Sequence, residues 1–221
     1  MSRSRSFTSA VEDYLKAIYR LERLADRPVS TTALASSLGL RAASVSGMLK
    51  KLDDLELIEY RSYHGVSLTE AGRRSALSVM RRHRLVELFL AEVLGIGWDE
   101  VHAEAEALEH AISPGLCDRI AARLGDPTVD PHGDPIPTKD GECVEPPTLG
   151  LGDIEPGAHA TLVRVSDRDS SVLKELTALR IALGAEMTMI DRSADGSSRV
   201  AVGSRHCTLR PDVVAAMRVV A

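Results

Sequence analysis

Two short helical segments that meet at Gly39 constrain the fold of this chain more than any other feature of its sequence. Ser30 is a good N-cap for a helix over Thr31–Leu38, and Gly39 ends that helix. A second helix is expected over Ala42–Leu55, where apolar residues recur along one stripe. Two short helices joined by such a tight turn form a helix-turn-helix, a motif that places its second helix in the major groove of DNA.

The segment after this motif is expected to form a β-hairpin, or wing. Two short β-like runs flank Ser62–Gly65 in the stretch LIEYRSYHGVSLT. Before the motif, Val11–Leu24 has the apolar spacing of an amphipathic helix, which Pro28 ends. This order of elements predicts a winged helix-turn-helix. The alternative is a helical hairpin with one solvated face, and the wing makes that alternative much less favoured.

The start of the second helix has the small and polar side chains that a recognition helix needs to enter a groove. Arg41 can reach a phosphate or a guanine edge, and Lys50 and Lys51 suit phosphates. Ser44 and Ser46 taken singly could be ordinary surface serines. The DNA-binding residues that we expect are Thr31, Thr32, Arg41, Ala43, Ser44, Ser46, Gly47, Lys50, Lys51 and Arg61.

The charge of the chain is unevenly distributed. Residues 1–75 hold 12 Lys and Arg against 9 Asp and Glu, a net charge of +3, whereas the rest of the chain has a net charge of −8. A mildly basic head fits a local DNA footprint even though the whole chain has a net charge of −5. Because only 3% of the residues are aromatic, the cores must be mostly aliphatic.

The sequence indicates a cytoplasmic protein with no membrane partner. No apolar run approaches the roughly 18 residues of a membrane span. The first residues lack the apolar region of a secretory signal. The three cysteines, Cys117, Cys143 and Cys207, are widely spaced, which favours reduced thiols over a disulfide framework.

The rest of the chain divides into a helical part and a β-rich part. Arg74–Leu94 and Trp98–Leu124 have the patterns of two longer helices, with two glycines between them. Residues 125–157 are rich in Pro, Gly and Asp, which is typical of a linker or an extended loop. The last part is expected to hold three strands and one helix, over Ala160–Val165, Glu186–Ile190, Arg199–Val202 and Ser170–Ala182.

The stretch Val101–His110 carries the side chains that point to a metal site. The four that share about one third of the circumference of an α-helix are His102, Glu106, Glu109 and His110. Two imidazoles and two carboxylates on one face are costly to bury unpaired, but they suit a divalent cation. The alternative for this stretch is a solvated acidic helix face.

A second set of potential ligands lies earlier in the chain. His83 and Glu87 are spaced i, i+4 on the preceding helix, and Asp13 on the first helix can add another carboxylate. Taken alone, a His and Glu pair at this spacing is usually a surface pair. The combination of both helices is more specific for a metal site.

Together these segments resemble the diphtheria toxin repressor family of metalloregulators, which includes iron-dependent regulators and manganese transport regulators. The resemblance is strong over about residues 8–140, and the part after that resembles the family's SH3-like domain. The segments that carry it are Glu12–Tyr19, the winged helix-turn-helix, Leu68–Gly72, Met80–Leu85, Val101–His102, Glu109–Ser113 and Pro131–Pro137.

The resemblance implies a mainly α-helical protein with a small β part and three domains. It implies a winged helix-turn-helix DNA-binding domain over residues 1–74 and a helical metal-binding and dimerisation domain over residues 75–145. An SH3-like domain is expected over residues 146–221.

The resemblance also implies two metal sites. By position, one site would use Asp13, Glu106, Glu109 and His110. The other would use His83, Glu87 and His102, with a further ligand from the C-terminal domain. The residue proposed for that ligand is Asp169, in the run Ser166-Asp167-Arg168-Asp169.

The ligand types favour Mn²⁺, with Fe²⁺ as the alternative. The family's iron branch places sulfur ligands where this chain has Asp13 and Glu106, and its manganese branch places oxygen ligands there. Hard oxygen ligands suit Mn²⁺ better than softer, later metals. Lys16 departs from the manganese branch, which has a carboxylate at that position, so a closely bridged two-manganese centre is not implied.

The expected function is metal-dependent repression of metal uptake genes by a cytoplasmic homodimer bound to a palindromic DNA operator. An iron-dependent regulator of the same family is the first alternative. A carboxylate and histidine metalloenzyme is a second, but the sequence has no HExxH motif and the helix-turn-helix would be unexplained, so no enzyme activity is expected. A third is a winged-helix regulator whose metal site has become purely structural.

Overall fold

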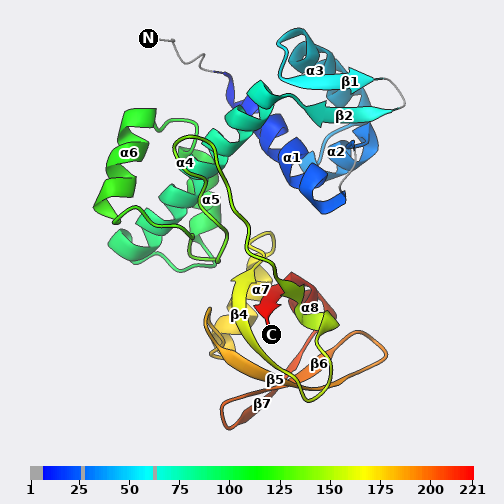
Figure 1. The fold of residues 1–221 in the computed structure, drawn as a ribbon, viewed down its shortest axis with the longest axis vertical. Helices are drawn as coiled ribbons and strands as arrows, with labels where there is room; N and C mark the ends of the chain where they lie inside the picture. The colour runs from blue at the N-terminus through cyan, green and yellow to red at the C-terminus, as the bar shows by residue number, and fades with distance from the viewer. Residues whose placement is uncertain (1–6, 26–27, 62–63) are drawn as a thin grey trace. The chain divides into compact units, whose positions relative to one another are not determined.

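The computed structural model describes residues 7–25, 28–61 and 64–221 (Figure 1). The chain forms two compact units. The first comprises Met1–Arg82 with Pro137–Cys143, and the second comprises His83–Ile136 with Val144–Ala221. None of the helices in the described part of the chain is long and apolar enough to cross a lipid bilayer.

The first unit is a winged helix-turn-helix (Figure 1). The hairpin strands pair antiparallel, with Ile58 opposite Leu68 and Arg61 opposite Gly65. The tip residues of the expected wing, Ser62 and Tyr63, lie outside the described residues. The elements are α1 (Ser9–Ala25), α2 (Thr31–Leu38), α3 (Ala42–Asp54), β1 (Ile58–Arg61), β2 (Gly65–Leu68) and the first half of α4 (Glu70–Leu94).

Capping residues fix the two ends of α2 at the positions that the sequence predicts. The Ser30 hydroxyl accepts a hydrogen bond from the Ala33 amide at 3.1 Å, which satisfies one of the free amides at the helix start. Gly39 adopts a left-handed conformation with φ of 65°, and its amide bonds back to the end of the helix. The predicted helix over Thr31–Leu38 is therefore confirmed, and α3 ends one residue before the predicted Leu55.

The core of the first unit is aliphatic, as the composition requires. Its helices and hairpin enclose a cluster that includes the fully buried side chains Leu15, Ile18, Leu34, Leu49 and Leu52. α1 and α4 are also joined by an ion pair, in which Arg82 lies 2.7 Å from Glu12. These contacts fix α2 and α3 on α1 and hold the recognition helix in place.

The second unit begins with the C-terminal half of α4, followed by α5 (Val101–Leu108) and α6 (Pro114–Arg123). The single helix predicted over Trp98–Leu124 is wrong, because the chain breaks between α5 and α6. Pro114 sets the start of α6, since proline disfavours helical backbone in the residue before it and suits the first turn of a new helix. The hydroxyl of Ser113 caps that new helix through the Leu116 amide at 3.2 Å.

The segment between α6 and the C-terminal sheet is an extended loop over much of its length. Arg84 is buried and organises the loop, because its guanidinium donates to the Pro135 carbonyl and lies 3.2 Å from Asp134 Oδ1. Ile136 packs into an apolar cluster with Leu85 and residues of α6. The proline- and glycine-rich composition therefore reflects an ordered loop.

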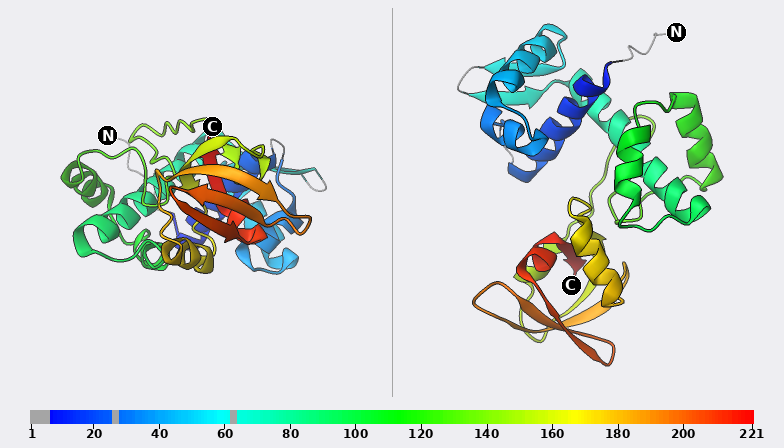
Figure 2. Two further views of the ribbon diagram at one scale, coloured as in Figure 1. Left: turned by 90° about the horizontal axis from the view of Figure 1, so that it is seen from below. Right: turned by 180° about the vertical axis from the view of Figure 1, so that it is seen from behind.

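The C-terminal part is an antiparallel sheet with strand order β3-β8-β4-β5-β6-β7, covered by two short helices (Figure 2). Its core is again aliphatic, with Leu162, Leu176, Met189 and Val219 almost wholly buried. The predicted helix ends earlier than expected, at Ala178. The elements are β3 (Leu149–Gly150), a 3-10 turn η1 (Leu151–Asp153), β4 (His159–Val165), α7 (Ser170–Ala178), β5 (Glu186–Arg192), β6 (Ser198–Val202), β7 (Arg205–Leu209), α8 (Pro211–Ala216) and β8 (Met217–Val220).

Gly72 provides a test of the packing in the first unit. A Cβ atom added there would lie 1.9 Å from the Leu57 carbonyl oxygen, which is backbone and cannot easily move. Gly72→Ala is therefore expected to lower the free energy of unfolding by about 1–3 kcal/mol or more. Gly47→Ala, on α3 with nothing within 4 Å of an added Cβ, is the matched control. Equal thermal midpoints for both variants would contradict this packing.

Candidate DNA-binding surface and metal centre

Most of the residues predicted to contact DNA are exposed on the helix-turn-helix and its wing. Thr31 and Ser46 are partly buried, and the Ser46 hydroxyl donates to the Ala42 carbonyl at 3.0 Å, within its own helix. The side chain of Arg41 makes no capping bond at the start of α3. The exposed members of the predicted set are Thr32, Arg41, Ala43, Ser44, Gly47, Lys50, Lys51 and Arg61.

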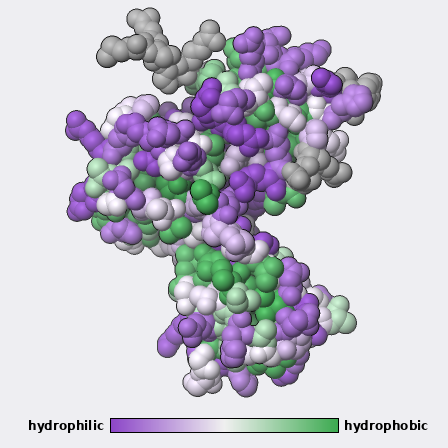
Figure 3. Space-filling view, in the orientation of Figure 1, coloured by the Kyte–Doolittle hydropathy of each residue, from purple (hydrophilic) through white to green (hydrophobic). Residues whose placement is uncertain are grey.

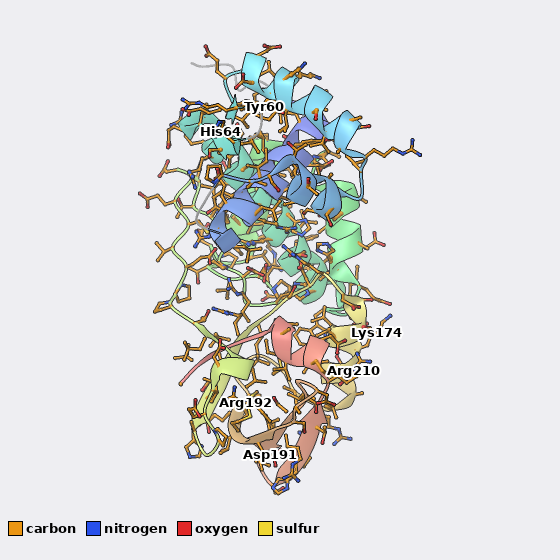
Figure 4. The ribbon with its side chains drawn as sticks, turned by 90° about the vertical axis from the view of Figure 1, so that its right-hand side faces the viewer. Tyr60, His64, Lys174, Asp191, Arg192 and Arg210 are labelled. Carbon is orange, nitrogen blue, oxygen red and sulfur yellow. The ribbon has the colours of Figure 1, made fainter. Side chains whose placement is uncertain are left out.

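The wing lies next to α3 in the sequence and in the fold. Tyr60, on β1, and His64, between the strands, are labelled in Figure 4. The Tyr60 amide donates to Asp53 Oδ1 at 3.0 Å, which ties β1 to the end of α3. The visible face of this region is mostly hydrophilic in Figure 3.

Four side chains of the second unit form the His83 cluster: His83, Glu87, His102 and Asp167. α4 contributes the first two, α5 contributes His102, and Asp167 follows the end of β4. Glu87 Oε1 lies 3.0 Å from His83 Nε2 and 3.2 Å from His102 Nδ1. Asp167 Oδ2 lies 2.8 Å from the same nitrogen of His102. The four donor atoms therefore converge on one small volume.

The pKa values of Glu87 and His102 in the His83 cluster are shifted strongly, in opposite directions. Burial raises the pKa of Glu87, but the hydrogen bonds from His102 and His83 outweigh this effect and lower the pKa to about 2. Hydrogen bonds to Asp167 and Glu87 raise the pKa of His102 to about 10. The carboxylate of Glu87 is therefore ionised although its side chain is fully buried.

The donor set fits a divalent cation. Its four atoms, two imidazole nitrogens and two carboxylate oxygens, all lie within 4.8 Å of one another. His83 Nε2 and His102 Nδ1 are 3.2 Å apart, a distance that fits a hydrogen bond between the two rings as well as two nitrogens that bind one metal ion. Of the buried oxygens in the described residues, Glu87 Oε2 also has no hydrogen-bond partner.

A second group of potential ligands meets the other ring nitrogen of His83. Its Nδ1 lies 2.6 Å from Glu109 Oε2 and 3.9 Å from Glu106 Oε1. His110 Nε2 lies 3.4 Å from Glu109 Oε1. The structure thus brings together three of the four residues predicted for the other site, although Glu109 and His110 follow the end of α5. The fourth, Asp13, belongs to α1 in the first unit.

Asp169, the C-terminal ligand proposed from the sequence, is not part of the His83 cluster. It is the N-cap of α7, where its Oδ1 accepts the Ser171 amide at 2.9 Å. Hydrogen bonds from the side chain and then from the amide of Ser171 lower the pKa of Asp169, whose side chain is exposed. Asp167 stands beside His102 instead. The sequence run contains both carboxylates, and only the path of the chain after β4 shows which of them joins the His83 cluster.

Two further polar residues near the His83 cluster were not singled out from the sequence. Asp130 and His132 lie in the loop after α6, are buried, and form a group of potential ligands with Glu87. Burial raises the pKa of Asp130 well above its usual value, and the charges of Asp134 and Glu87 raise it further. The loop composition alone gave no sign that these side chains point inward.

Three family descriptions match successive parts of the chain. Residues 6–66 match "Iron dependent repressor, N-terminal DNA binding domain". Residues 69–138 match "Iron dependent repressor, metal binding and dimerisation domain", and residues 149–221 match the FeoA domain.

Individual relatives agree with these matches. The chain is 39% identical to the iron-dependent repressor IdeR of Mycobacterium tuberculosis over 157 residues, 71% of this chain and 64% of that protein. It is 33% identical to the regulator MntR of Oceanobacillus iheyensis over 113 residues, 51% of this chain and 76% of that protein. A solved manganese-dependent transcriptional repressor in complex with manganese has 40% identity and a TM-score of 0.89, with 95% of this chain and 99% of that chain covered.

The class of protein is that of the metal-dependent transcriptional repressors. Three features define it: a winged helix-turn-helix, helices with convergent imidazole and carboxylate donors, and an SH3-like β domain. The chain belongs to the iron-dependent repressor family, which is also the family of the diphtheria toxin repressor. The expected resemblance and fold class are confirmed. These relatives are repressors and not enzymes, in agreement with the absence of enzyme activity expected from the sequence.

The two neighbouring aspartates give a direct test of the ligand set. Asp167→Asn is expected to weaken Mn²⁺ binding to the His83 cluster by at least tenfold, because it removes one of two carboxylates. Asp169→Asn removes the same charge two residues away, at the exposed cap of α7, and is expected to leave Mn²⁺ affinity unchanged. Equilibrium titration of the full chain measures both; a larger loss for Asp169→Asn would refute the assignment.

Proposed function

We propose that this protein is a metal-dependent, DNA-binding transcriptional repressor that controls metal uptake genes and responds to Mn²⁺. The observation that carries the proposal is the convergence of two imidazoles and two carboxylates in the His83 cluster. The exposed start of α3 supports the DNA-binding part. A relative that is 40% identical is a manganese-dependent repressor, which supports the regulatory part.

The proposed metal sites follow the ligand groups. One is the His83 cluster, with Asp167 as its C-terminal ligand in place of Asp169. The other would use Asp13 with Glu106, Glu109 and His110. A bound divalent cation supplies positive charge that offsets the carboxylates and competes with the proton of His102.

The residues of the His83 cluster join three elements of the second unit. His83 and Glu87 lie in the middle of α4, and His102 lies at the start of α5. Asp167 lies in the segment that follows β4. A metal-loaded cluster therefore favours one arrangement of these elements over others. If that arrangement binds DNA better, metal shifts the population toward the DNA-binding form by mass action.

Mn²⁺ is favoured over Fe²⁺ because every proposed ligand is an oxygen or an imidazole nitrogen. Sulfur ligands would favour softer metals, and the proposed sets contain none. Fe²⁺ is the alternative, since the chain is also 39% identical to an iron-dependent repressor. We further propose that a cytoplasmic homodimer binds a palindromic operator, with the two recognition helices about 34 Å apart.

Metal-dependent DNA binding tests the proposed function. The full chain is first used with Mn²⁺ to select a duplex from a random library, and its affinity for that duplex is then measured by fluorescence anisotropy. We expect tight binding with Mn²⁺ and at least tenfold weaker binding after chelation. Equal affinity in both conditions would rule out metal-dependent repression. Replacement of Mn²⁺ by Fe²⁺ or Zn²⁺ in the same assay ranks the metals.

Arg41→Ala separates DNA contact from metal binding in that assay. It is expected to reduce DNA-binding free energy by roughly 1–3 kcal/mol and to leave Mn²⁺ affinity unchanged. Lys174→Ala, which removes an exposed positive charge on α7 (Figure 4), is the matched control and is expected to change neither.

A further inference from the structure

Trp98, in the segment between α4 and α5, joins the helices to the apolar core of the C-terminal sheet. The second unit has a helical part, His83–Ile136, and a C-terminal part, Val144–Ala221. The indole of Trp98 packs against the core cluster of the C-terminal part, whose other members all lie between Leu151 and Val219. Among the apolar clusters of the described residues, this is the one with members from both parts.

The indole of Trp98 is also hydrogen-bonded to the C-terminal part. Its Nε1 donates to the hydroxyl of Thr177, on α7, at 2.8 Å. That hydroxyl donates in turn to the Leu173 carbonyl at 2.9 Å, so its hydrogen is used and a lone pair is left for the indole. Both donors are therefore satisfied by this pair of side chains, which we call the Trp98–Thr177 contact.

The Trp98–Thr177 contact joins the two segments that bring His102 and Asp167 together. Trp98 is four residues before His102 in the chain, and Asp167 is three residues before the start of α7 at Ser170. His102 Nδ1 and Asp167 Oδ2 lie 2.8 Å apart. The contact therefore holds the segment that leads to one proposed ligand against the helix that follows the other.

The chain before Asp167 is anchored separately. Val165, the last residue of β4, donates its amide to the His132 carbonyl, in the loop after α6, at 2.9 Å. That bond holds the strand before Asp167, and the Trp98–Thr177 contact holds the helix after it. A ligand on a tethered part contributes to binding only as far as that part is held in place, because the tether alone supplies a limited effective concentration.

We propose that Trp98 is a positioning residue for Asp167: its bond to Thr177 holds the C-terminal part against the helices, so that the Asp167 carboxylate reaches the His83 cluster. This inference rests on the proposed function of that cluster. The indole itself does not bind metal, because its nitrogen donates a hydrogen bond and has no free lone pair. By linkage, bound metal stabilises the contact by the same factor that the contact adds to metal affinity.

Substitutions at Thr177 separate the hydrogen bond from the packing. Thr177→Val keeps the shape of the side chain and removes the acceptor of the indole hydrogen, whereas Thr177→Ser keeps the hydroxyl and is the matched control. Each is made in the full chain carrying Glu106→Gln and His110→Gln, which remove ligands of the other proposed site. Each is made again in that chain with Asp167→Asn. Mn²⁺ affinity is measured by electron paramagnetic resonance of free Mn²⁺.

We expect Thr177→Val to weaken Mn²⁺ binding about fivefold, the typical net contribution of one hydrogen bond, and Thr177→Ser to stay within about twofold of the parent. With Asp167→Asn present, Thr177→Val is expected to change the affinity by less than about twofold, because the contact then has no carboxylate to position.

A second measurement needs no metal. Trp98 is the only tryptophan of the chain, so acrylamide quenching of tryptophan fluorescence reports on this contact alone. In the metal-free chains we expect Thr177→Val to increase the quenching and Thr177→Ser to leave it unchanged.

Four results would overturn the inference. Thr177→Val could bind Mn²⁺ as tightly as the parent, could leave the quenching of Trp98 unchanged, or could lose no more affinity than Thr177→Ser; each of these removes the role of the hydrogen bond. An equal loss of affinity in the Asp167→Asn chain would show that the contact supports the fold and does not position Asp167. All four leave the metal site intact.

The failure of the proposed function has a different signature. If the parent with the two background substitutions retains no Mn²⁺, the His83 cluster itself fails as a metal site, and the role of Trp98 fails with it.

Discussion

The buried carboxylate of Glu87 is the group on which the proposed metal site depends. A fully buried carboxylate is strongly destabilising unless charged or hydrogen-bonding groups surround it. In this chain His83 and His102 supply those groups, and they outweigh burial enough to keep Glu87 ionised. Such an arrangement holds carboxylate oxygens and imidazole nitrogens close together, which suits a divalent cation.

The elements around Glu87 supply the groups that surround its buried carboxylate. α4 places His83 one turn before Glu87, so both face the same side of the helix. Arg84, the residue after His83, binds the loop that carries Asp130 and His132. That loop in turn bonds to β4, which leads to Asp167. The proposed metal site and the packing of the second unit therefore share the same residues, so metal binding there would be linked to the arrangement of these elements.

Much of the fold was predictable because its signals are local. Ser30 and Gly39 limit α2 through capping and a left-handed turn, which need no tertiary information. The pairing of His83 with Glu87 also follows from helical spacing alone. The break before Pro114 was visible in the sequence, but the apolar periodicity on both sides of it suggested one continuous helix.

The parts that were not predictable depend on the path of the chain. Asp169 was the ligand expected from the sequence, but the exit from β4 places Asp167 beside His102 and the capping of α7 occupies Asp169. The burial of His132 depends in the same way on loop contacts with Arg84 and Trp98. Strands β3, β7 and β8 were also missed. β8 pairs with β3 and β4, which are distant in the sequence, whereas β7 pairs with the preceding strand β6.

The central claim is that the His83 cluster binds a divalent metal ion. The most direct test is an anomalous difference map from crystals of the full chain grown with Mn²⁺. We predict a peak ligated by His83 Nε2, Glu87, His102 Nδ1 and Asp167. Persistence of the direct contacts of His102 with Glu87 and Asp167, with Mn²⁺ bound only elsewhere, would contradict it.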